Sequence, residues 1–241
     1  MEKGRMQDIT FFSDELNEDV ELLVYLPPNY SEFHPYPYVV AQDGKHYFQL
    51  GRIARTLDEL IQKNEMEPIL FIGVSHHGVE DRRKKYHPNG IKKDAYIRFL
   101  AHELIPVVEN HFSLSNTGTN RALAGDSLAG SISFLTAMKY PNTFGKLMLH
   151  SPYVNEEMIQ IAKNFDQWHL LQMYHVIGSE EKEASLIDGS TDDFLTPNQN
   201  LQAVIRQTEA EYFFDIFSGN HSWKYWQQDL KRGLKYLFEK K

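Results

Sequence analysis

Residues 122–130 read ALAGDSLAG, and the interpretation of the whole chain starts from this stretch. The apolar run RALAG at residues 121–125 has the composition of a short buried strand, and SLAGSISFLTAMKYP at residues 127–141 has that of a helix. Ser127 therefore lies on a strand-to-helix turn, two residues after Gly125. A sharp turn of this kind raises a serine hydroxyl above the edge of a sheet, and it requires small neighbouring residues.

Strand-like and helix-like segments alternate on both sides of this turn, from about residue 38 to the end of the sequence. The expected strands are residues 8–13, 20–30, 36–44, 67–75, 121–125, 145–153, 170–179 and 211–221. The expected helices are residues 52–64, 94–112, 127–141, 155–168, 196–210 and 222–240. This alternation predicts one α/β domain over residues 1–241, in which a mostly parallel central sheet has helices on both faces. The first two strands are expected to form an N-terminal β-hairpin.

The sequence of two of these helices predicts a buried face in one and a kink in the other. The helix at residues 52–64 repeats its apolar residues with helical spacing, which indicates a buried face. That face consists of Ile53, Leu57, Leu60 and Ile61. The helix at residues 94–112 contains Pro106, which lacks a backbone N–H and is expected to kink the helix.

The composition limits the classes of protein to consider. The chain has 241 residues, 41% of them hydrophobic, which is enough for one sizeable core. It has no cysteine, so disulfides, thiolate metal sites and a cysteine nucleophile are excluded. The N-terminal sequence lacks the apolar segment of a signal peptide, and no apolar run is long enough to span a bilayer. We therefore expect a cytoplasmic protein without a membrane partner.

The charge balance argues against nucleic acid as a partner. Asp and Glu number 33 against 25 Lys and Arg, a net charge of −8. The one basic cluster, DRRKKYH at residues 81–87, is interpreted as a solvated charged face. His76 and His77 follow a strand, but no third ligand stands at a recognisable spacing, so no metal site is expected.

Ser127 is the candidate nucleophile. The usual motif is G-x-S-x-G, whereas this chain reads G-D-S-L-A-G, with Ala129 in place of the second glycine. The backbone N–H of Leu128, at the start of the helix, is placed to hold the oxyanion of a tetrahedral intermediate. The alternative interpretation is that Ser127 only caps the helix.

A serine nucleophile needs a base, and His221 is the best placed of the eleven histidines. It follows the last expected strand in the sequence SGNHSWKYW, after a glycine that lets the loop turn. His102 and His111 lie within a helix, and His175 lies inside an apolar strand, where a hydrogen-bonded core imidazole is expected. The chain order serine, acid, histidine is also that of α/β folds with this turn.

The acid that orients the imidazole is expected in the loop after the strand at residues 170–179. This loop offers several carboxylates: Glu180, Glu181, Glu183, Asp188, Asp192 and Asp193. Glu181 is close to the end of the strand, where the backbone is well fixed, and it is the first choice. Asp193 is the alternative, although a carboxylate near a helix start also stabilises the helix dipole.

The segments around Ser127 and His221 together resemble the esterase-D and enterochelin-esterase-like branch of the α/β-hydrolases, over residues 20 to 238. The resemblance implies the α/β-hydrolase fold and hydrolysis of carboxylic esters without a cofactor. Ser127 and His221 match the nucleophile and base of the family. Trp223 and Trp226 match its two tryptophans, whereas Ser222 stands where aspartate is usual.

Three further matches complete the resemblance. AQDGKHYF at residues 41–48 resembles the family segment that borders the oxyanion hole, which implies a second donor in the amide of Gly44 or Lys45. RKKYHP at residues 83–88 resembles a stretch near the pocket, so Arg83 is expected there. The family often has its acid three residues after the glycine that ends the strand, and this count also reaches Glu181.

The hypothesis is therefore a serine ester hydrolase that acts on a small-molecule ester, with Tyr47, Arg83, Trp223 and Trp226 around the substrate pocket. Two alternatives stay open: an inactive hydrolase scaffold with a binding role, which the departures at Ala129 and Ser222 motivate, and acyl transfer from the same serine to an alcohol. The sequence indicates neither the particular ester nor an oligomeric state.

Overall fold

The computed structural model describes residues 3–185 and 189–240. Its strands are β1 (Arg5–Ser13), β2 (Glu18–Leu26), β3 (Tyr38–Ala41), β4 (Leu70–Val74), β5 (Arg121–Asp126), β6 (Lys146–His150), β7 (Gln172–Gly178), β8 (Ala184–Ser185), β9 (Thr191–Asp192) and β10 (Glu211–Phe217). Its α-helices are α1 (Gly44–Gln49), α2 (Ile53–Gln62), α3 (Val79–Tyr86), α4 (Lys93–Phe99), α5 (Ile105–His111), α6 (Leu128–Lys139), α7 (Glu156–Asn164), α8 (Leu195–Ile205) and α9 (Trp223–Phe238). Short 3₁₀ turns cover Gly118–Asn120, Trp168–Leu170 and Glu181–Glu183.

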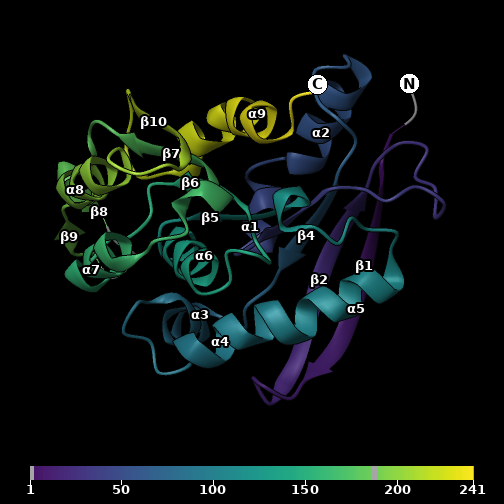
Figure 1. Ribbon diagram of the computed structural model, residues 1–241, viewed down its shortest axis with the longest axis horizontal. Helices are drawn as coiled ribbons and strands as arrows, with labels where there is room; N and C mark the ends of the chain where they lie inside the picture. Colours follow the sequence, from purple (N-terminus) through teal and green to yellow (C-terminus); the bar gives the residue numbers. More distant parts are fainter. Residues whose placement is uncertain (1–2, 186–188, 241) are drawn as a thin grey trace.

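The central sheet has eight strands in the order β1-β2-β4-β3-β5-β6-β7-β10 (Figure 1). The β1–β2 hairpin pairs antiparallel and joins the sheet through an antiparallel β2–β4 pair. From β4 to β10 every neighbouring pair is parallel. The predicted hairpin and mostly parallel sheet are confirmed, and the arrangement is the α/β-hydrolase fold.

Both faces of the sheet are buried, because successive residues of a strand point to opposite sides. In β5, Leu123 belongs to the core under α4, α5 and α6, whereas Ala122 and Ala124 belong to the core under α1, α2 and α9. These two groups of helices lie on opposite sides of the sheet in Figure 1. The apolar face predicted for α2 is confirmed at its main positions, with Ile53, Leu57 and Leu60 buried.

The structure adds two helices that the sequence analysis did not predict, α1 and α3. Both are short, with six and eight residues, and α3 is too uniformly polar to show a periodic apolar face. The helix expected at residues 94–112 is divided by a π-helical turn over Leu100–Leu104, just before Pro106. Widening the helix there accommodates a proline whose missing N–H would otherwise interrupt the backbone ladder.

The interpretation of residues 81–87 as a solvated charged face is wrong for two of its cations. Lys85 is only 2% exposed and pairs with Glu18 and with Asp81, 2.6 Å away. Arg82 is turned inward to pair with Asp43 at 2.6 Å. Because α3 packs on the body of the protein, one side of this charged helix is forced to find buried partners.

His175 confirms the expectation of a core imidazole. It is fully buried in β7, and its ring nitrogens lie 2.8 Å from the Tyr212 hydroxyl and 2.7 Å from Asn198 Oδ1. Burial lowers the pKa of His175 to about 4, so the ring is neutral at pH 7.

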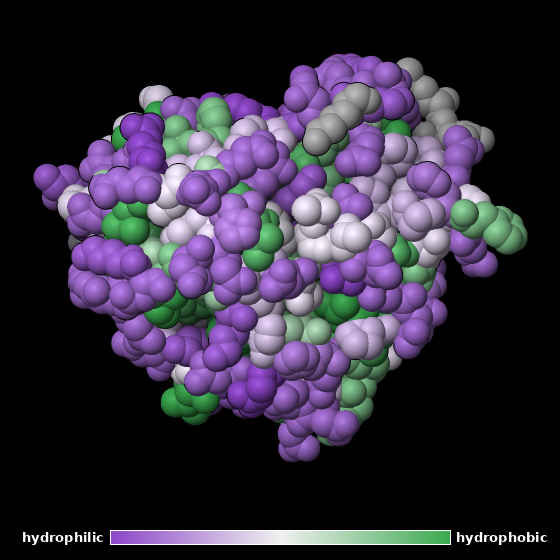
Figure 2. Space-filling model, in the orientation of Figure 1, coloured by the Kyte–Doolittle hydropathy of each residue, from purple (hydrophilic) through white to green (hydrophobic). Residues whose placement is uncertain are grey.

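The surface shows no broad apolar face in the view of Figure 2, where hydrophobic residues form small, separate groups among hydrophilic ones. Two open hollows, of about 510 and 490 Å³, are lined by Pro28, Asn29, His34, Tyr36, Ile61, Gln62 and Pro68, and by residues of α7, α8 and their flanks. Neither contains Ser127 or His221. Among residues 3–185 and 189–240, no helix has the length and apolarity needed to cross a bilayer.

Gly125 tests how closely α6 packs on β5. A Cβ at this position would lie 2.2 Å from the backbone carbonyl of Ala129, a distance that real structures do not contain. We expect Gly125→Ala to destabilise the fold by about 2–3 kcal/mol, measured by urea unfolding, because α6 must shift to relieve the overlap. The overlap is with backbone atoms, so the double variant Gly125→Ala/Ala129→Gly should be no more stable than the single one. Wild-type stability for Gly125→Ala would contradict this packing.

Candidate active site

Ser127 stands between the end of β5 and the start of α6, in the strand–turn–helix context that the sequence predicts. Its backbone has φ 52° and ψ −126°, an unfavourable conformation for a residue with a side chain. Three backbone hydrogen bonds hold it: Ser127 N donates to the His150 oxygen at 3.0 Å, and the Ser127 oxygen accepts from Ser131 N and from Tyr153 N, both at 3.1 Å. The side chain makes no capping hydrogen bond to α6, so the interpretation as a simple helix cap is wrong.

Strained backbone recurs along this edge of the sheet. Asp43, Ser127 and Ser151 have φ angles of 58°, 52° and 48°, and they follow the neighbouring strands β3, β5 and β6. Conformations of this kind cost about 1–3 kcal/mol each and concentrate at functional sites. The edge formed by the carboxyl ends of the strands is therefore the place to look for chemistry, as in other open α/β sheets.

The departure from the glycine pattern at Ala129 is accommodated by the core. Ala129 is fully buried and packs within the apolar cluster beneath α6. Glycine is instead required at position 130, where the start of α6 lies close to Pro152 and to the end of β5. A Cβ on Gly130 would lie 3.0 Å from Pro152 Cβ and 3.1 Å from the Gly125 oxygen. The methyl group of Ala129 thus fills core space and leaves the turn intact.

Glu181 lies beside His221, with its carboxylate fully buried and Oε2 2.6 Å from His221 Nδ1. Its other oxygen, Oε1, accepts hydrogen bonds from Gly178 N at 2.8 Å and from the Ser151 hydroxyl at 2.6 Å. A Cβ on Gly178 would lie 2.6 Å from Oε1, so glycine is needed there to admit the carboxylate. Both oxygens of the buried carboxyl group thus have hydrogen-bonding partners, which compensates for its burial.

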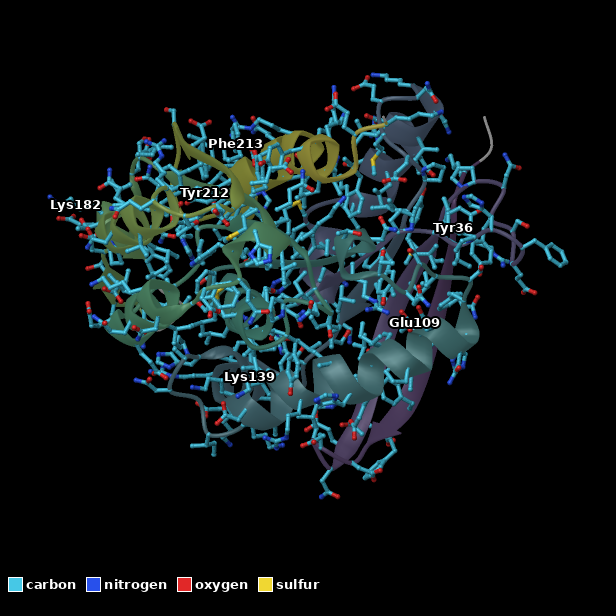
Figure 3. All side chains as sticks on the ribbon, viewed as in Figure 1. Tyr36, Glu109, Lys139, Lys182, Tyr212 and Phe213 are labelled. Carbon is cyan, nitrogen blue, oxygen red and sulfur yellow. The ribbon has the colours of Figure 1, made fainter. Side chains whose placement is uncertain are left out.

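The short 3₁₀ turn Glu181–Glu183 explains why Glu181 alone of its neighbours reaches inward. Glu180, Lys182 and Glu183 are exposed, and Figure 3 shows Lys182 at the periphery of the molecule. Asp193, the alternative acid, lies at the start of α8, where Oδ1 accepts a hydrogen bond from Thr196 N at 2.9 Å. Asp192 is exposed, and Asp188 lies outside the described residues. Asp193 therefore stabilises a helix start, whereas Glu181 contacts the imidazole.

Ser151 is a site residue that the sequence analysis missed. Its hydroxyl donates to Glu181 and accepts a hydrogen bond from Trp226 Nε1 at 3.0 Å. Trp226 is only 3% exposed and packs edge-on against His221, with ring centroids 4.8 Å apart, and Phe194 covers the imidazole at 4.3 Å. The sequence offers no local signal for Ser151, because only the pairing of β6 with β7 brings it to Glu181.

Ser127 and His221 share the same edge, since they follow β5 and β10, and Ser151 and Glu181 follow the strands between them, β6 and β7. Within the described part of the chain, the Ser127 hydroxyl makes no hydrogen bond to His221. Such bonds are often long before substrate binds. The His221 side chain is 11% exposed, so its ring remains accessible from the site.

The predicted oxyanion donors lie in the first turns of two helices. Leu128 is the first residue of α6 and Gly44 the first of α1, followed by Lys45. N–H groups in a first turn have no partner within the helix. A Cβ on Gly44 would lie 2.4 Å from Gly73 Cα, so glycine is required where α1 approaches β4.

The residues predicted to surround the pocket lie at different depths. Tyr47 is fully buried and packs edge-on against the half-buried Trp223 at 4.9 Å, and Trp226 is buried beside His221. Arg83 is exposed on α3, whereas its neighbour Arg82 reaches the Asp43 carboxylate. Because α3 was not predicted, its inward face was not identified. Among the described residues, no cluster of three or more His, Asp or Glu side chains is arranged to hold a metal ion.

Comparison with known proteins supports a common origin with esterases. The profile of the family described as "Putative esterase" matches residues 13–237. The chain is 43% identical over 232 residues to the uncharacterized protein YjcH of Bacillus subtilis strain 168, covering 96% of this chain and 97% of that protein. A solved ferulic acid esterase superposes with a TM-score of 0.81 at 17% identity and 99% coverage of both chains. Enterochelin esterase of Shigella flexneri superposes with a TM-score of 0.82 at 17% identity, covering 96% of this chain and 57% of that one.

The contacts of Ser151 yield a stability prediction. Ser151→Ala leaves the buried Trp226 Nε1 without its acceptor and removes one donor from Glu181. We expect a loss of about 1–3 kcal/mol in the free energy of unfolding, measured by urea titration, because a buried polar group loses its partner. Ser222→Ala is the matched control, since in the described part of the chain the hydroxyl of this half-buried serine bonds only its near neighbour Asn220, and the variant should lie within about 0.5 kcal/mol of wild type. Equal stabilities of the two variants would contradict the prediction.

Proposed function

The chain belongs to the esterase family of carboxylic ester hydrolases, and we propose that it forms its acyl-enzyme on Ser127, with His221 as base and Glu181 as the acid that orients the base. One observation carries this proposal: the fully buried Glu181 carboxylate lies 2.6 Å from His221 Nδ1. That bond fixes the ring with a proton on Nδ1 and leaves Nε2 to accept one. The strained turn at Ser127, on the same edge of the sheet, supplies the nucleophile.

In the first half of the proposed reaction, the Ser127 hydroxyl attacks the ester carbonyl as its proton passes to His221 Nε2. The carbonyl oxygen gains the negative charge and is held by the N–H of Leu128 and by one N–H of Gly44 or Lys45. When the tetrahedral intermediate breaks down, His221 returns the proton to the leaving alkoxide. The alcohol departs, and Ser127 carries the acyl group.

In the second half, water attacks the acyl-enzyme while His221 again takes the proton. The tetrahedral intermediate collapses, the carboxylic acid leaves, and Ser127 regains its hydrogen. Glu181 orients His221 in both halves and stabilises the imidazolium that forms twice per turnover. Its three donors, which include Gly178 N and the Ser151 hydroxyl, keep the carboxylate in place.

The substrate proposed is a small-molecule ester. Relatives and structural neighbours carry names that include feruloyl esterase, salmochelin esterase and enterobactin esterase, which supports esters whose acid part carries a hydroxylated aromatic group as the first compounds to test. The exposed edge of the half-buried Trp223 and the rings of Phe194 and Trp226 around His221 offer apolar surface for such an acyl group.

Ser127→Ala tests the nucleophile. We expect kcat on a short ester such as p-nitrophenyl acetate to fall by about 10⁴-fold or more, because only binding and oxyanion contacts would remain. A fluorophosphonate probe should label wild type and not the variant. Unchanged turnover in Ser127→Ala would rule out the acyl-enzyme, and an unlabelled wild type would favour the inactive scaffold. A rise in transferred acyl product on adding alcohol would favour acyl transfer.

Glu181→Gln and Asp193→Asn form a matched pair for the acid. Both replace a carboxylate by an amide of the same shape, but only Glu181 contacts His221. We expect Glu181→Gln to lower kcat by about 10³–10⁴-fold, since an uncharged partner neither fixes the tautomer nor stabilises the imidazolium. Asp193→Asn should stay within about threefold of wild type. The reverse order in kcat would assign the acid to Asp193.

A further inference from the structure

A second acidic group lies on the other side of Ser127 from the triad. Asp126 ends β5 directly before Ser127 and is 4% exposed, and Asp43 follows β3 and is 2% exposed. β3 and β5 are parallel neighbours with Ala41 opposite Ala124, and Gln42 N donates to the Ala124 oxygen at 2.9 Å. Each aspartate comes two residues after one of the paired alanines, and the charge of Asp43 raises the pKa of Asp126, so the two carboxyl groups lie near each other.

The hydrogen-bond partners of these two groups are unequal. Asp43 Oδ2 accepts from Arg82 Nε and lies 2.6 Å from both Nε and Nη2 of that guanidinium. Asp43 Oδ1 and Asp126 Oδ1 are both buried, and among the described residues neither has a hydrogen-bond donor. His76 Nε2 lies 3.4 Å from Asp43 Oδ1 but is not aligned for a hydrogen bond. Native proteins rarely leave two buried acceptor oxygens in one place without a hydrogen-bond donor.

The positive charge around the two carboxyl groups balances one anion but not two. Within residues 3–185 and 189–240, Arg82, from α3, is the one arginine or lysine that pairs with Asp43, and burial lowers the pKa of His76, which favours the neutral ring. Among the described residues, the phenol of Tyr47, from α1, lies near both carboxyl groups, and those of Tyr86 and Tyr96, from α3 and α4, lie near Asp43. Gln42 Nε2, beside Asp43 in the chain, is a further buried donor. A second carboxylate here would be a buried charge without a counter-ion, which is strongly unfavourable.

We propose that Asp126 is a positioning residue that keeps its proton at neutral pH and donates it to Asp43 Oδ1, thereby fixing the loop that carries Gly44 and Lys45 beside Ser127. The donated hydrogen bond satisfies both unpartnered oxygens at once, and Arg82 balances the single remaining charge. Burial first, and then the charge of Asp43, raise the pKa of the Asp126 carboxyl to about 8, with Arg82 opposing, which agrees with this protonation.

The consequence for the reaction concerns the oxyanion loop and rests on the proposed function. Asp43 has a left-handed backbone conformation, φ 58° and ψ 39°, directly before Gly44. The proposed hydrogen bond from Asp126 and the one that Arg82 Nε donates hold its side chain, and therefore hold the start of α1, which packs beside β4 (Figure 1). Loss of the Asp126 proton would set two carboxylates against each other and release this loop.

The first test measures the proton without using activity. Asp126→Asn has the same shape and donates an N–H at every pH. A group protonated in the folded state and ionised in the unfolded state makes the fold less stable as pH rises. Between pH 5 and 7, we expect the unfolding equilibrium constant of wild type to rise about tenfold per pH unit relative to Asp126→Asn.

Asp193→Asn is the control for this test. Asp193 Oδ1 accepts a hydrogen bond from Thr196 N at 2.9 Å, and although burial opposes it, this bond lowers the pKa of the Asp193 carboxyl. The group is therefore ionised between pH 5 and 7 in the folded state as in the unfolded one, and Asp193→Asn should add no pH-dependent difference in that range. A difference in stability between wild type and Asp126→Asn that does not change with pH would overturn the proposal.

If Asp126→Asn fails to fold, infrared spectroscopy of wild type replaces this test. We expect the band of a protonated carboxylic acid at pH 7 and its loss on titration toward pH 9. Absence of the band at pH 7 would overturn the proposal.

The second test addresses positioning. Above pH 8, kcat of wild type on p-nitrophenyl acetate should fall about tenfold per pH unit with little change in KM, because the oxyanion donors act on the transition state. Asp126→Asn should hold kcat constant to pH 9.5, whereas Asp126→Ala should have a reduced kcat at all pH values. Identical pH profiles for wild type and Asp126→Asn would overturn the positioning role. A wild type inactive at every pH would refute the proposed function instead, and the stability test would still decide the shared proton.

Discussion

The burial of the Glu181 carboxylate is the constraint on which the candidate site depends. A fully buried carboxylate is tolerated only where donors surround it, and here the donors come from three separate segments: Gly178 N, the Ser151 hydroxyl and the His221 ring. Each donor follows a different strand of the same parallel sheet, or ends one. The sheet order β5-β6-β7-β10 therefore decides which side chains can meet, and it brings Ser127 to the same edge.

Strain and polar contacts accumulate together along that edge. Asp43, Ser127 and Ser151 all have left-handed φ angles, and each lies within two residues of the end of a central strand. The conformations persist because backbone bonds to neighbouring strands hold them, such as Ser127 N to the His150 oxygen and Ser151 N to the Val176 oxygen. The well-packed layers on both faces of the sheet supply the stability that such strained positions cost.

Ser127 is thus placed between two acidic groups that behave in opposite ways. On one side, the Glu181 carboxyl group is surrounded by the His221 ring, the Ser151 hydroxyl and Gly178 N. On the other side, Asp126 and Asp43 share one cation, Arg82, and two of their oxygens lack a donor. Both groups are acidic side chains, and they differ in their hydrogen-bonding partners. Those of Glu181 suit it to orient a base, whereas those of Asp126 suit it to keep a proton.

The sequence by itself determined the alternating strands and helices, the sharp turn at Ser127 and the position of His221 after the last strand, because these are signals of local spacing and turn chemistry. It reduced the acid to a few loop carboxylates, with Glu181 favoured, but tertiary structure alone decided which one touches the imidazole. It likewise missed Ser151, the short helices α1 and α3 and the inward turn of Arg82. The physical reason is that burial and donor supply depend on segments about 30 to 40 residues apart in the chain, Ser151 and Glu181 or Asp43 and Arg82, which only the packed sheet brings together.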